Sequence, residues 1–84
     1  MELKDTVELM LSNDYKERFK AEYHQLAYRL RNLKKLLKGW DDENLAFTPT
    51  CPRSVYDLQI KAMSEYKAIL EARAVMEGIE LPKM

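Results

Sequence analysis

Two long stretches without glycine or proline constrain the fold of this chain most strongly. The 84-residue sequence has only two glycines and three prolines, and none of them falls within residues 14–38 or 53–77. Both stretches are rich in Leu, Ala, Glu, Lys, Arg, Gln and Met, the residue types that lose least conformational entropy in a helix. The sequence therefore predicts two long helices.

In the first stretch, apolar residues recur every three or four positions, which places them on one face of a helix and fits no strand. This stripe consists of Phe19, Tyr23, Leu26, Leu30, Leu33, Leu37 and Trp40. Asp14 followed by Glu17 is typical of a capping box, and Gly39 is placed to end the helix in a left-handed turn. We expect a helix over residues 14–39.

The second stretch carries two apolar stripes that point to different sides of the predicted helix. One stripe consists of Val55, Leu58, Ala62, Tyr66, Ile69, Arg73 and Met76. The other consists of Tyr56, Ile60, Met63, Leu70 and Ala74. Because one partner helix cannot cover both stripes, we expect this helix to pack on the first helix and also on another copy of the chain. Ser54 with Asp57 resembles another capping box, and Gly78 is expected to end the helix.

These elements predict an all-α fold, in which an antiparallel helical hairpin with a short N-terminal helix assembles into a homo-oligomeric bundle, from dimer to hexamer. We expect one domain over residues 1–84. The predicted elements are an arm at 4–12, a helix at 14–39, a loop at 40–52, a helix at 53–77 and a tail at 78–84. A chain of this length buries only about 60% of the surface that its unfolded state exposes, so its core is marginal.

Composition excludes several classes of function. The 14 Lys and Arg balance 14 Asp and Glu, whereas domains that hold nucleic acid by bulk charge usually carry a basic excess. One cysteine, Cys51, and one histidine, His24, cannot supply a disulfide framework, a cysteine-rich zinc site or a histidine-based active site. No apolar run approaches the ~20 residues of a membrane helix, and the first residues are no signal peptide. We therefore expect a protein of a reducing compartment that is not an enzyme and has no cofactor or metal. We expect no binding to membrane, and binding to nucleic acid is disfavoured.

Basic residues gather at one end of the predicted hairpin. Residues 29–38 contain five cationic side chains and no acid, and in a hairpin they lie beside the start of the second helix. A helix N-terminus with neighbouring Arg and Lys is suited to phosphate or carboxylate, and aromatic side chains nearby can stack on a base. The predicted ligand-binding residues are Lys34, Lys38, Trp40, Phe47, Arg53, Ser54, Tyr56 and Lys61. Cations near a helix C-terminus also complement its dipole, so a purely structural role of this cluster stays open.

Residues 5–10, 14–18, 48–54, 70–74 and 77–79 together carry a resemblance that covers almost the whole chain. They resemble a family of small phage and prophage proteins related to a crAss-like-phage gene product. This resemblance implies viral origin and expression in the cytoplasm of a bacterial host.

The run Asp-Leu-Gln at residues 57–59, followed by Met63, carries a second resemblance. It is similar to the second helix of phage hairpin proteins that counter CBASS and Thoeris immunity. Those proteins are oligomeric sponges, so the resemblance implies binding of a cyclic oligonucleotide or cyclic ADP-ribose signal without cleavage. Where that family has a small residue and then an aromatic one, this chain has Lys61 and Ala62, and no individual ligand contact carries over.

The sequence thus predicts a phage anti-defence protein that sequesters a nucleotide-type immune signal. The alternative is a protein-directed inhibitor of a bacterial defence enzyme, an anti-CRISPR-like protein or adaptor that docks through the second helix. A DNA-binding protein is the third and least favoured function, because the net charge is zero and no helix-turn-helix is recognisable.

Overall fold

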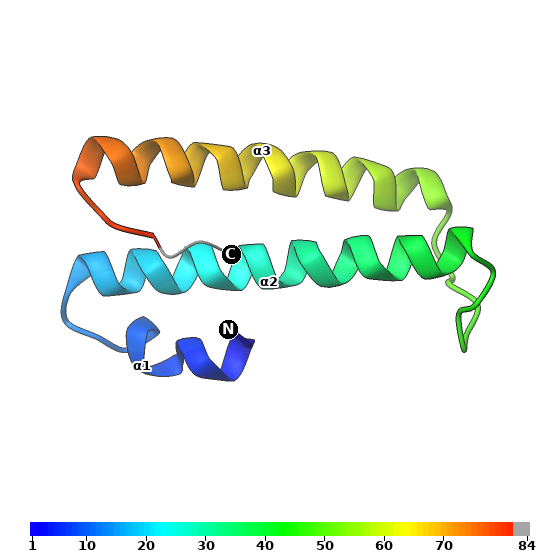
Figure 1. Ribbon diagram of the computed structural model, residues 1–84, viewed down its shortest axis with the longest axis horizontal. Coiled ribbons are helices and arrows are strands. Elements are labelled where there is room, and N and C mark those ends of the chain that lie inside the picture. The colour runs from blue at the N-terminus through cyan, green and yellow to red at the C-terminus, as the bar shows by residue number, and fades with distance from the viewer. Residues whose placement is uncertain (82–84) are drawn as a thin grey trace.

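The computed structural model describes residues 1–81 as an all-helical chain (Figure 1). A 3₁₀ helix at Leu3–Thr6 leads into the short helix α1 at Val7–Met10, which is followed by α2 at Tyr15–Asp41 and α3 at Arg53–Glu77. Helices α2 and α3 run antiparallel, and the N-terminal arm folds back along the other side of α2. The all-α fold with helix packed on helix is therefore confirmed, whereas the homo-oligomeric bundle stays a prediction. Residues 82–84 of the expected tail lie outside the described residues, and no helix within residues 1–81 has the length and apolar character needed to cross a membrane.

The core lies where the first half of α2 meets the second half of α3. Its buried residues are Phe19, Tyr23, Leu26, Leu70, Ala74 and Ile79. Leu70 is completely buried, with an exposed fraction of 0%. Of the two stripes expected on the second helix, the one that contains Leu70 and Ala74 is therefore the one that packs against α2.

Most of the other stripe of α3 faces away from α2, whereas its Arg73 reaches Tyr15 at the start of α2. Leu58 is 67% exposed, Ile69 58% and Met76 78%. A single chain thus covers only one of the two apolar sides of α3.

Polar contacts at both ends of the hairpin fix its antiparallel register. At the open end, the Tyr15 hydroxyl donates to Glu77 Oε1 at 2.8 Å and accepts from Arg73 Nη2 at 2.8 Å. At the loop end, Arg53 at the start of α3 forms an ion pair with Asp41 at the end of α2. These contacts join residues far apart in the sequence and align the two helices along their length.

The two long helices begin in different ways. Asp14 caps α2, because its side chain accepts a backbone N–H of the first turn at 3.0 Å. The expected capping box of Ser54 and Asp57 does not form, since Pro52 occupies the capping position and Ser54 is already helical. Asp57 instead accepts a hydrogen bond from Arg53 Nε at 3.1 Å.

Both long helices end in a left-handed turn of the same kind. After α3, Gly78 has φ 69° and the Ile79 N–H donates to a carbonyl of the last helical turn at 2.8 Å. After α2, the turn does not fall at Gly39, which is helical, but at Glu43 with φ 58°. The Asn44 N–H then donates to the Gly39 carbonyl at 2.9 Å, which completes the pattern of a Schellman motif.

Substitution of these two turn residues is expected to change stability in opposite directions. A side chain in the left-handed conformation costs roughly 1 kcal/mol, because Cβ crowds the neighbouring carbonyl. Gly78→Ala should therefore lower the free energy of unfolding by about that amount, and Glu43→Gly should raise it. Urea unfolding followed by circular dichroism measures both changes. If the free energy of unfolding changes in the same direction in the two variants, the left-handed turn is wrong at one of the two positions.

The N-terminal arm is held on α2 around the buried residue Thr6. The Thr6 hydroxyl donates to the Leu3 carbonyl at 2.7 Å and accepts from Gln25 Nε2 at 2.9 Å. Nearby on α2, His24 is only 2% exposed, and its Nδ1 atom has no hydrogen-bond partner among residues 1–81. Burial of the imidazole, followed by the charges of the N-terminal amine and Lys20, lowers the pKa of His24.

We expect His24 to protonate below its ordinary pKa of 6.5 as long as the chain is folded. Because the unfolded chain takes up this proton at higher pH, the stability conferred by neutral His24 is fully present above pH 6.5. It is lost as the pH falls through the lower folded-state pKa. Proton NMR of the imidazole measures this directly, since the sequence has one histidine. The urea-unfolded chain is the control, and a folded-state pKa at or above the unfolded value would disprove the expectation.

Candidate functional site

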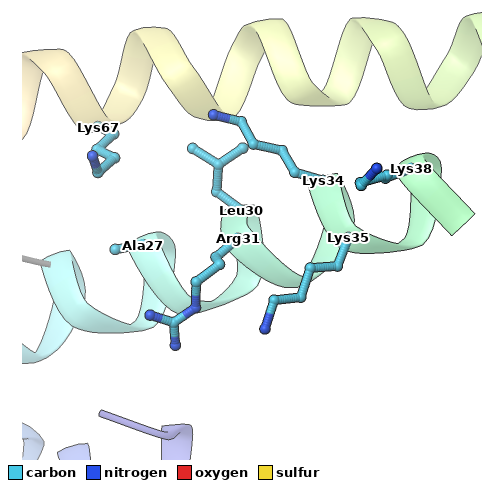
Figure 2. Close-up of a pocket in the computed structure, with 7 residues that line it drawn as sticks. All are labelled: Ala27, Leu30, Arg31, Lys34, Lys35, Lys38 and Lys67. Atoms are coloured by element: carbon cyan, nitrogen blue, oxygen red, sulfur yellow. The ribbon is translucent and has the colours of Figure 1, made fainter.

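A basic pocket of about 360 Å³ lies beside the second half of α2 (Figure 2). Its lining residues are Ala27, Leu30, Arg31, Lys34, Lys35, Lys38 and Lys67. Lys67 approaches from α3, and all the others belong to α2. Five of the lining side chains are cationic and none is acidic, so the pocket concentrates positive charge on a chain whose net charge is zero.

Helical spacing brings these residues together. Ala27, Arg31, Lys34 and Lys38 follow one another at steps of four, three and four, which places them on one side of α2. Ala27 and the buried Leu30 supply apolar surface beneath the charged groups. Because α2 is continuous from Tyr15 to Asp41, most of the pocket is carried by one rigid element.

Only part of the positive charge in the pocket is balanced by nearby acids. Lys38 lies 3.3 Å from Asp42, and Lys67 lies 3.7 Å from Glu71. Exposed pairs of this kind are weak, so both lysines can exchange their partner for a ligand. The three pocket cations without an acidic partner among the described residues are Arg31, Lys34 and Lys35. The Arg31 guanidinium lies over the Tyr28 ring, 5.5 Å from its centroid.

The side chains that line the basic pocket are suited to binding an anionic ligand. Lysine ammonium and arginine guanidinium groups donate charge-assisted hydrogen bonds to phosphate or carboxylate oxygens. Leu30 and Ala27 can contact an apolar or planar part of the same ligand. Within residues 1–81, no group of three His, Cys, Asp or Glu side chains is arranged to hold a metal ion. The cationic and apolar groups that line the pocket together fit an organic anion.

The predicted site residues fall into three groups. Lys34 and Lys38 line the basic pocket, and both also line a neighbouring pocket of about 460 Å³ that reaches Arg53 at the start of α3. Arg53 is already engaged, because it pairs with Asp41 and with Asp57. The hydrogen bond from Arg53 lowers the pKa of the Asp41 carboxyl, so this acid stays ionised and keeps its partner.

The predicted aromatic residues form a second group at the loop end. Trp40 and Tyr56 pack edge to face with ring centroids 5.9 Å apart, and Arg53 lies over the Trp40 ring at 5.8 Å. Phe47 is exposed and lines, with Trp40, a separate loop pocket of about 260 Å³. Stacking surface is thus present near the basic pocket but does not line it.

Ser54 and Lys61 make up the third group, which the structure places apart from the basic pocket. Both side chains are exposed. Lys61 lies three residues after Leu58, on the outward side of α3. Ligand binding by these residues, as by the rest of the predicted set, stays a prediction.

Sequence reasoning did not single out Arg31, Lys35 and Lys67. The first two lie in the basic stretch 29–38, where the spacing of four, three and four could have separated the pocket side of α2 from its other sides. Lys67 could not be found in this way, because its place in the pocket depends on how α3 is aligned with α2.

The basic pocket and most of both long helices lie within one stretch that matches a known protein family. A family model described as Sequestin matches residues 13–76. Searches of curated proteins and of solved structures gave no match to this chain. Because the family model matches well over half of the sequence, the chain belongs to the Sequestin family.

Proposed function

We propose that this chain sequesters a small phosphorylated signal of the nucleotide type and holds it without cleaving it. The observation that carries the proposal is the pocket with five cationic side chains and no acidic one. The name of the family denotes sequestration, which is a binding role and not a catalytic one, and so supports the proposal. The similarity of residues 57–59 to phage proteins that counter CBASS and Thoeris favours a cyclic oligonucleotide or cyclic ADP-ribose.

The size and charge of the pocket fit a ligand with more than one phosphate. Residues 27–38 extend over roughly 16 Å of helix, and the cationic groups are distributed along that length. A single phosphate would engage only one part of it. The ring of a base or ribose can contact Leu30, and Trp40 and Phe47 lie beyond Lys38, where a second base could stack.

We place this activity in the cytoplasm of an infected bacterium. The resemblance of residues 5–10, 14–18 and 48–54 to small phage and prophage proteins supports a viral origin. In that setting, a captured signal is withheld from the defence effector that it would activate. Sequestration of this kind requires tight binding and abundance, and it requires no chemistry.

A ligand panel tests the proposal. We expect at least one cyclic dinucleotide, cyclic trinucleotide or cyclic ADP-ribose isomer to raise the melting temperature, since a ligand at 100 times its Kd stabilises the folded state by about 2.7 kcal/mol. The linear form of the same nucleotide is the control. Mass spectrometry after heat denaturation should return the ligand unchanged. The absence of any shift at saturating ligand, or the recovery of a cleaved product, would refute the proposal.

A second candidate function is inhibition of a bacterial defence enzyme by direct contact. The exposed apolar side of α3, with Leu58, Ile69 and Met76, favours it, because apolar anchors of this kind commonly dock on partner proteins. A stoichiometric complex with a purified defence enzyme, unaffected by nucleotide and lost in Leu58→Glu, would favour this function over sequestration.

A further inference from the structure

The outward side of α3 has the residue pattern of a helix that pairs with another helix. Val55, Leu58, Ala62, Glu65, Ile69, Ala72 and Met76 alternate at steps of three and four. This is the heptad spacing of helices that pack lengthwise. All of these residues are exposed, although six of the seven are apolar. Nothing within the described chain covers them, because α2 lies against the opposite side of α3.

We propose that two copies of this chain pair antiparallel through this stripe of α3, about a two-fold axis between Ala62 and Glu65. The stripe runs from Val55 to Met76, which is about 32 Å along the helix, so a second copy can pack against it lengthwise. This inference does not depend on the proposed ligand.

The charged residues of this surface favour a second copy of the chain as its partner. Glu65 is the only charged residue within the stripe, and Lys61 lies at its edge one turn earlier. Neither has an ion-pair partner in the part of the chain that the structure describes. In an antiparallel pair centred between Ala62 and Glu65, each Lys61 lies beside Glu65 of the other copy. The dimer would therefore contain two such ion pairs between Lys61 and Glu65, related by the two-fold axis.

The same register matches the sizes of the facing side chains. Leu58 of one copy lies opposite Ile69 of the other, on both sides of the axis. Near the axis, the small side chain of Ala62 faces Glu65, which leaves room for the carboxylate to turn toward Lys61. A register shifted by one heptad places Glu65 against Ile69 and removes its partner, so the ion pairs define the alignment.

Pairing in this way leaves both basic pockets open. Lys67 extends from α3 toward α2, on the side away from the stripe, and the remaining pocket residues belong to α2. The two pockets of a dimer therefore lie on its outer flanks, and each is built by one chain. The proposed dimer thus differs from an oligomer in which two copies form a shared ligand site at their interface.

Sedimentation equilibrium across the micromolar range tests the interface. We expect a dimer for the unchanged chain and a monomer for Leu58→Glu/Ile69→Glu, in which both positions are exposed and the fold can persist. The matched control is Val75→Glu, on the same helix and 83% exposed but outside the stripe, which should remain a dimer. Circular dichroism verifies helix content in each variant. A monomeric unchanged chain, or a dimer that survives Leu58→Glu/Ile69→Glu, would overturn the proposal.

A charge exchange tests the register. Lys61→Glu and Glu65→Lys should each raise the dimer dissociation constant about tenfold or more, since like charges then face each other on both sides of the axis. The double variant Lys61→Glu/Glu65→Lys should restore an affinity close to the original. If the double variant is as weak as the single ones, the antiparallel register is wrong.

Discussion

Replacement of Lys34 and Lys35 together by glutamate is expected to abolish capture of a phosphorylated ligand while the fold persists. Both residues line the basic pocket and have no acidic partner among the described residues, so they are free to bind the ligand. A hydrogen bond to a charged group contributes about 1.5–3 kcal/mol, so loss of two such contacts weakens binding by about 100-fold or more. Titration calorimetry at constant salt measures the loss, with whichever ligand gives the largest thermal shift.

The matched control makes the same change of net charge outside the pocket. Lys4→Glu/Arg29→Glu alters two exposed cations that do not line it, and we expect this variant to bind within about threefold of the unchanged chain. Equal losses of affinity in the two double variants would mean that ligand binding depends only on the net charge of the chain. An undiminished affinity in Lys34→Glu/Lys35→Glu would place the ligand elsewhere.

Leu70→Ala is expected to have the largest effect on stability. Leu70 is completely buried between α2 and α3, and truncation of such a leucine costs about 2–5 kcal/mol through lost burial and the cavity that remains. Because small domains have only about 5–15 kcal/mol of stability, this is a large share of the total. Urea unfolding at one fixed protein concentration measures the change, so that any self-association contributes equally to both chains.

Val75→Ala provides the control for this substitution. Val75 lies on the same helix, and its truncation removes two side-chain carbons where that of Leu70 removes three. It is 83% exposed and belongs to neither apolar side of α3 that we have described. We expect a change within about 0.5 kcal/mol. A cost for Leu70→Ala below about 1 kcal/mol would mean that α3 does not pack against α2 through this residue.

The sequence predicts the helices well because their signals are local. The apolar spacing defines α2 and both sides of α3, and Asp14 marks the start of α2. The end of α2 is different, because Gly39 lies inside the helix. A Cβ atom at Gly39 would lie only 3.0 Å from Leu45 Cδ2, so glycine at this position allows the loop to pack back onto the helix. Residue preferences at helix ends do not report such a contact between helix and loop. They place the left-handed turn at Gly39, whereas it falls at Glu43.

The candidate site is predictable only in part, for the same reason. The stretch 29–38 identifies the basic segment, and Lys34 and Lys38 do line the pocket. The sequence alone does not reveal that Arg53 meets Asp41 across the hairpin or that Lys67 completes the pocket, since both depend on the alignment of two helices. Residue type and spacing thus predict which groups share a helix face, and packing decides which of them stay free.

The continuity of α2 has a consequence for the speed of binding. Six of the seven pocket residues move with one helix, so no hinge or lid has to close before a ligand is held. Under the proposed function, association would then be limited by diffusional encounter, and the pocket cations Arg31, Lys34 and Lys35 would accelerate it in an ionic-strength-dependent manner. If the chain sequesters a signal as proposed, it would compete with the receptor of that signal through its association rate as well as through its affinity.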